Sequence, residues 1–137
     1  MFDLYGFQSG ATAFLIAFAA AGAFTIAFKL IYQWITPYHE HTLIRAGNTA
    51  AAVTLGGALI GYVLPLASAL SNTVSLAEFA AWALLAAGVQ ILVFLVVSRL
   101  LMRDLKVRIE AGEMGAALYL AAISICAGLL NAACMTA

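Results

Sequence analysis

Four polar side chains interrupt long apolar stretches of the sequence, and they are the first residues whose chemistry needs an explanation. Lys29 precedes Ile35 by six residues, so its flexible stem can carry the ammonium group to the headgroup region of a bilayer. An amide buried in hydrocarbon must find a hydrogen-bond partner, which favours bonds between helices over the alternative of a pore lining. The residues of this candidate polar path are Lys29, Gln33, Gln90 and Asn131.

Two loops carry the remaining charges that could act on a partner. In the first, His39-Glu40-His41 offers two imidazoles and one carboxylate, which fall short of a closed metal site and leave open a docking role, pH sensing or an ordinary interfacial loop. In the second, Asp104 and Arg108 are four residues apart, the spacing of an ion pair on a short helix. The candidate docking residues of both loops are His39, Glu40, His41, Arg45, Arg103, Lys106 and Arg108.

The composition explains why these polar residues stand out. The chain has 137 residues, of which 66% are hydrophobic and 9% are charged, whereas soluble domains carry about 25% charged residues. Six Lys and Arg balance six Asp and Glu, so no net charge attracts nucleic acid. We find no nucleophile–base constellation, no phosphate-binding loop and no metal-ligand spacing, and we therefore expect no catalysis, no metal and no cofactor.

Four apolar runs are long enough to cross a bilayer, whose hydrocarbon core of roughly 30 Å requires about 20 helical residues. They cover residues 11–35, 49–70, 79–102 and 115–133 approximately. Each run is apolar around its whole circumference, which is typical of a transmembrane helix and excludes an amphipathic surface helix. Pro37 ends the first run, and Asn48 and Glu113 stand at helix starts, where capping explains them. The predicted fold class is an all-α integral membrane protein with four transmembrane helices.

The positions of the basic residues predict the orientation of these spans. Arg45 lies between the first two spans, and Arg99, Arg103, Lys106 and Arg108 lie between the last two. Lys and Arg near span ends are retained in the cytoplasm. The sequence therefore predicts cytoplasmic charged loops and two periplasmic termini in an inner-membrane protein.

An internal similarity divides the chain in two. A shift of 65 positions (109 minus 44) aligns IRAGNTAAAVTL, which begins at Ile44, with IEAGEMGAALYL, which begins at Ile109. Two spans return the chain to its starting side, so the two copies would share one orientation. We predict a parallel 2+2 duplication, with residues 1–70 as the first two-helix repeat and residues 71–137 as the second.

Small residues recur at helical spacing in the second and fourth spans. Lipid supplies no hydrophobic force between helices, so their association depends on close backbone approach. Packing within one chain and contact between subunits both explain the pattern, and the small volume of four Ala-rich helices favours a homo-oligomer. The candidate packing residues are Gly57, Gly61, Ser124, Gly128 and Ala132.

The segment at residues 35–70 and the C-terminal AGLLNAACMTA carry a family resemblance. Their most specific pieces are the Pro-Tyr-x-Glu turn at residues 37–40, Gly47-Asn48-x-Ala-Ala-Ala, Pro65-Leu66-x-Ser-Ala and the ending at residues 131–136. Over nearly its whole length the chain resembles the domain-of-unknown-function 350 family of YjfL-like bacterial inner-membrane proteins. This resemblance implies four spans and no established activity, and the genes that neighbour such proteins imply an envelope-related or polyamine-linked setting.

Two functions of different kinds are consistent with the sequence. One is an oligomeric scaffold or regulatory subunit of an envelope-related system, whose cytoplasmic loops dock a cytosolic partner. The other is a small channel or transporter for an ion or small polar solute along the candidate polar path. The partners expected in either case are the lipid bilayer and further copies of the chain.

Overall fold

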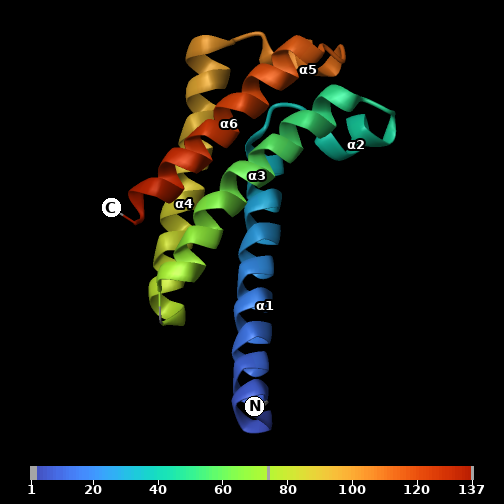
Figure 1. Cartoon of the computed structure of the whole chain (residues 1–137). Helices are drawn as coiled ribbons and strands as arrows, with labels where there is room; N and C mark the ends of the chain where they lie inside the picture. The colour runs from blue at the N-terminus through green and yellow to red at the C-terminus, as the bar shows by residue number, and fades with distance from the viewer. Residues whose placement is uncertain (1–2, 74, 137) are drawn as a thin grey trace.

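The computed structural model describes residues 3–73 and 75–136, and these residues form helices joined by short turns (Figure 1). Four helices are long and apolar enough to span a membrane, which confirms the predicted all-α membrane fold. The elements are α1 (Leu4–Ile35), α2 (Glu40–Arg45), α3 (Thr49–Asn72), α4 (Leu76–Val96), the π-helix η1 (Val97–Leu101), α5 (Leu105–Glu110) and α6 (Met114–Cys134).

The helix ends follow from local chemistry. Thr36 precedes Pro37, which disfavours the helical conformation, and Thr36 adopts extended backbone angles that end α1. Asn48 caps α3, because its side-chain oxygen accepts a hydrogen bond from the Ala51 amide at 3.1 Å. Gly47 and Gly112 take positive φ values of 87° and 76° in the turns that precede α3 and α6.

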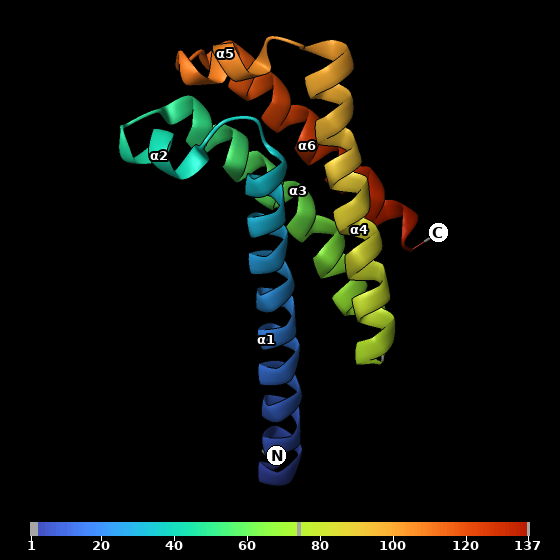
Figure 2. The same ribbon diagram turned by 180° about the vertical axis from the view of Figure 1, so that it is seen from behind.

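The two short helices α2 and α5 lie at the same end of the molecule (Figures 1 and 2). We call this end, residues 36–48 and 102–113, the charged rim. The beginning of α1, the end of α3 and the beginning of α4 lie away from it. α2 begins at Glu40 and α5 at Leu105, so these helices start 65 residues apart (105 minus 40), the same shift that the sequence shows. The parallel duplication itself stays a prediction.

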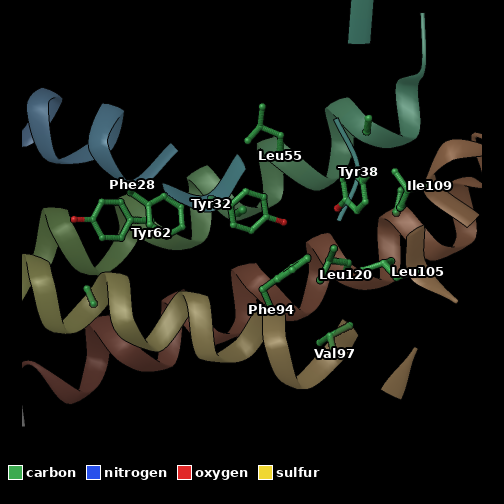
Figure 3. Close-up of a cluster of buried hydrophobic side chains, with 14 of the residues drawn as sticks. Phe28, Tyr32, Tyr38, Leu55, Tyr62, Phe94, Val97, Leu105, Ile109 and Leu120 are labelled. Carbon is green, nitrogen blue, oxygen red and sulfur yellow. The ribbon is translucent and has the colours of Figure 1, made fainter. Parts of the chain in front are cut away.

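The helices contribute unequally to the core. α3 and α6 make the most extensive contact, and α4 packs against both. α1 has 32 residues and therefore a length of about 48 Å, and it buries only Phe28 and Tyr32. Phe28 stacks on Tyr62 with ring centroids 4.4 Å apart, and Tyr32 meets Phe94 edge-on at 5.2 Å (Figure 3). These aromatic contacts join α1 to the rest of the bundle.

Candidate functional site

A buried carboxyl group lies beneath the charged rim and is the most unusual polar feature of the structure. Only 2% of Glu40 is exposed. The surrounding polar groups come from separate elements: α1 supplies Tyr32, the turn after it supplies Thr36 and Tyr38, and α3 supplies Thr54. We call these five residues the Glu40 cluster. Figure 3 shows the Tyr32 and Tyr38 rings with their hydroxyl groups turned toward one another.

The polar atoms of this cluster are poorly satisfied. Among the residues that the structure describes, neither carboxyl oxygen of Glu40 has a hydrogen-bond partner, and the hydroxyl groups of Tyr32 and Tyr38 also lack one. The Thr36 hydroxyl lies 3.1 Å from the Gln33 carbonyl and 3.3 Å from that of Tyr38, so its proton is directed to the backbone. The Thr54 hydroxyl likewise donates to the Ala51 carbonyl at 2.9 Å. An ionised carboxylate in this position would be a buried charge without bonds, which costs several kcal/mol.

The cost of burying that charge appears as a shift in proton affinity. Burial raises the pKa of Glu40 from 4.5 to about 7, and the Thr36 hydroxyl and the positive charge of Lys29 offset only part of this rise. Burial also raises the pKa of Tyr38 to about 12; the charge of Glu40 adds to that rise and the hydroxyls of Thr54 and Tyr32 oppose it. Glu40 is therefore a group that can take up or release a proton near neutral pH.

The structure does not bring the four residues of the candidate polar path together. The Gln90 amide donates to the carbonyl oxygens of Gly61 at 3.0 Å and Ser124 at 3.2 Å, so it ties α4 to the crossing of α3 and α6. Lys29 and Gln33 lie in α1 and Asn131 lies near the end of α6. Within the described residues, no hydrogen bond joins any two members of this set.

The candidate packing residues lie where α3 crosses α6. A Cβ atom added to Gly57 would approach Ala121 to 2.6 Å, and one added to Gly61 would collide with the Ser124 carbonyl oxygen. A Cβ atom added to Gly128 would collide with the backbone of Gly61. The Ser68 hydroxyl donates to the Ala132 carbonyl at 3.1 Å in the same interface. These small residues thus pack α3 against α6 within one chain.

The candidate docking residues gather at the charged rim. His39, His41, Arg45, Arg103 and Lys106 are exposed. Arg108 is half-buried and forms ion pairs with Asp104 at 2.8 Å, as its spacing predicted, and with Glu113 at 3.6 Å.

Glu40 departs from the expectation that it faces a partner, because its side chain is buried beside Tyr32 and Tyr38. The sequence carried one signal of this inward turn. Glu40 follows a proline-ended helix by only a few residues, so the chain must fold back before α3 begins. Nothing in the local pattern, however, identified which member of His39-Glu40-His41 faces inward.

The fold and its rim define a class, a four-span all-α membrane protein with a polar end, and comparison with known proteins supplies the family. The model of the Domain of Unknown Function (DUF350) matches residues 6–135. The chain is 41% identical over 126 residues to the UPF0719 inner membrane protein YjfL of Escherichia coli K12. This alignment covers 89% of this chain and 95% of the relative. The same protein of Escherichia coli O157:H7 gives the same values. No solved structure matches. The chain belongs to the DUF350 family.

Proposed function

We propose that this protein is a scaffold or regulatory subunit of an envelope-related membrane system, and that it docks a cytosolic partner at the charged rim. The observation that carries the proposal is the gathering of five exposed basic or imidazole side chains at one end of the bundle, three of them on the short helices α2 and α5 and two in the turns just before these helices. Two separate loops contribute them, so a partner would contact both halves of the chain. Such a role requires no catalysis and no cofactor.

Orientation supports this assignment. Because Lys and Arg are retained on the cytoplasmic side, we expect the charged rim to face the cytoplasm and the start of α4 to face the periplasm. A cytosolic protein with an acidic surface would then meet the rim with complementary charge, which speeds association and selects against basic partners.

The channel alternative receives less support from the same residues. Gln90 uses both of its N–H groups on backbone carbonyls at the α3–α6 crossing, so its amide has a packing role. Glu40, which can exchange a proton, is buried beside Tyr32 and Tyr38 at the end of the bundle that carries the charged rim. Neither feature provides a polar route between the two ends.

The predicted homo-oligomer stays a prediction. α1 exposes large apolar side chains such as Phe14 and Phe18. Either lipid or a second copy of the chain would cover such a face, so the exposure does not distinguish the two. The docking role does not depend on the stoichiometry.

Site-specific photocrosslinking in living cells tests the docking role. A photoreactive phenylalanine analogue is introduced at His41 or Lys106 on the rim, and at the exposed Ala77 in the first turn of α4 as the matched control. We expect one and the same cytosolic protein to be joined to the chain from positions 41 and 106, and none from position 77. Charge reversal by Arg45→Glu and Arg103→Glu should abolish the product.

Reconstitution of the purified chain into liposomes tests the channel alternative. The docking proposal predicts that the purified chain in liposomes passes ions and small polar solutes no faster than empty vesicles do. Flux above that background, lost in the Glu40→Gln variant, together with no crosslinked protein at the rim, would establish the channel instead.

A further inference from the structure

A cavity of about 350 Å³ opens beside the charged rim, and we propose that it binds the phosphate of an anionic phospholipid. Three elements enclose it: the end of α1, the last turns of α4 with η1, and the start of α5 (Figure 2). Apolar side chains form one part of the lining, among them Ile35, Phe94 and Leu105. The basic side chains of Arg99, Arg103 and Lys106 form another part.

The charges around this cavity are strongly segregated. Its lining contains three cations and no carboxylate. The nearby acids Asp104 and Glu113 pair with Arg108, and all three line a different cavity on the other side of α5. In the described part of the chain, Arg99, Arg103 and Lys106 form no ion pair. The cavity therefore has positive charges that form no ion pair with residues 3–73 or 75–136.

The side chains, rather than the backbone, must bind the anion. α4 and η1 end here, and a helix end with free carbonyl groups repels negative charge. The Arg103 Nε–H donates to the Arg99 carbonyl at 3.1 Å, which offsets one of those carbonyls and holds the guanidinium group against the π-helix. A guanidinium held in this way presents its remaining N–H groups in the planar fork that matches phosphate oxygens.

The depth of the cavity identifies the source of the phosphate as a lipid. Trp34 adjoins the lining residue Ile35 and is 87% exposed, and exposed Trp side chains mark the boundary between acyl chains and headgroups. Leu100 and Leu101 of η1 are exposed apolar residues at the same level. A phospholipid with its phosphate at the basic side chains would direct its acyl chains along this apolar surface. Basic pockets between helices on the cytoplasmic side bind anionic headgroups in this manner.

Native mass spectrometry of the full chain tests the site. The protein is released from mixed micelles that contain equal amounts of phosphatidylglycerol and phosphatidylcholine, and the ratio of the two bound lipids is measured. We expect phosphatidylglycerol to be retained preferentially. Each cation near a membrane surface contributes about fivefold in affinity for an anionic lipid, so Arg103→Gln and Lys106→Gln should each reduce the preference by roughly that factor.

Arg45→Gln is the matched control, because Arg45 is an exposed rim cation outside the cavity. An unchanged preference in this variant, with loss in the two cavity variants, supports the site. Equal retention of both lipids by the unsubstituted chain, or an equal loss in Arg45→Gln, overturns it. Displacement of phosphatidylglycerol by millimolar inorganic phosphate would assign the cavity to a free phosphate group and overturn the lipid assignment. Lys106 is exposed on a short helix, so its variant tests the site even if Arg103→Gln unfolds.

Discussion

Each of the two short rim helices begins with a buried side chain, which we call its anchor. The anchor of α2 is a carboxyl group, and the anchor of α5 is apolar. Glu40 begins α2 and is 2% exposed, and Leu105 begins α5 and is 1% exposed. Both anchors turn inward beneath the rim, and both helices lead to a glycine with positive φ. An apolar side chain satisfies this position in α5, so the fold does not require an acid in α2. Packing at this position therefore does not by itself account for the carboxyl group of Glu40.

The residues that follow the two glycines differ in a second way. Asn48 caps α3 and also donates to the Ile109 carbonyl at 2.7 Å, which links the start of α3 to α5. Glu113 makes no capping bond and instead pairs with Arg108. The link between the rim helices thus depends on Asn48, and the charged turn after α5 contributes only a surface ion pair.

The largest predicted effect on stability lies where α3 of the first half of the chain crosses α6 of the second half. Gly61→Ala would place a methyl group against the Ser124 carbonyl, and because backbone cannot move aside as a side chain can, we expect a loss of about 2–3 kcal/mol in the free energy of unfolding. Gly56→Ala, where no atom lies within 4 Å of the added Cβ, is the control and should be neutral or slightly stabilising. Reversible unfolding of both variants in micelles checks this. Equal behaviour of the two variants would show that the close crossing is not what joins the halves.

The second prediction concerns Glu40, whose counterpart in α5 is the apolar Leu105. Below a pH of 4.5, Glu40 is protonated in the folded and unfolded chain alike; as the pH rises to about 7, the unfolded chain loses this proton first, so stability falls. Above the folded-state pKa of about 7 the loss levels off. The groups that face Glu40 are Lys29, Thr36, Tyr32 and Tyr38, and no other carboxyl group is among them. The total loss should be on the order of 3 kcal/mol.

Replacing the acid tests this directly. Glu40→Gln, and Glu40→Leu as the equivalent of α5, should remove the fall in melting temperature between pH 5 and pH 8 and leave both variants more stable than the original chain at pH 8. Glu78→Gln, at an exposed acid in the first turn of α4, should leave the pH profile unchanged. A profile that is flat in the original chain would contradict the elevated pKa of Glu40.

The smallest predicted effect on stability distinguishes Asn48 from Glu113, the residues that follow the two glycines. Asn48→Ala loses a helix cap and a bond to α5, so we expect a loss of about 1–2 kcal/mol in the free energy of unfolding. Glu113→Ala loses only a partly exposed ion pair of 3.6 Å and should cost less than about 0.5 kcal/mol. The two variants are compared by thermal unfolding in micelles. A larger cost for Glu113→Ala would reverse this assignment.

Much of the fold follows from composition and spacing. Long apolar runs and proline or glycine at their ends predicted the four spans, although α1 begins seven residues before the expected residue 11, because nothing polar enough to stop the helix lies between Leu4 and Ala11. The third span ends in the π-helix η1, and the helical conformation is interrupted at Met102. α5 is therefore a separate helix and does not continue the span. No periodicity signals such a break.

The sites were harder to predict because they depend on which face of a helix meets which neighbour. Gln90 and Gly61 lie 29 residues apart and meet only once three helices have packed. Glu40 is buried beside Tyr32 of α1, and the cavity beside Arg103 is lined by Ile35 at the end of the same helix. A single sequence identifies these residue types but not their tertiary neighbours.

The location of the charged rim is the claim on which the docking role depends. His41→Cys, Lys106→Cys and Ala77→Cys are introduced one at a time in a chain whose own cysteines are replaced by Cys126→Ser and Cys134→Ser. A membrane-impermeant maleimide is applied to spheroplasts and to inverted inner-membrane vesicles. We predict that positions 41 and 106 react only in inverted vesicles and position 77 only in spheroplasts. Reaction of positions 41 and 106 in spheroplasts would contradict the account and remove the cytosolic docking surface.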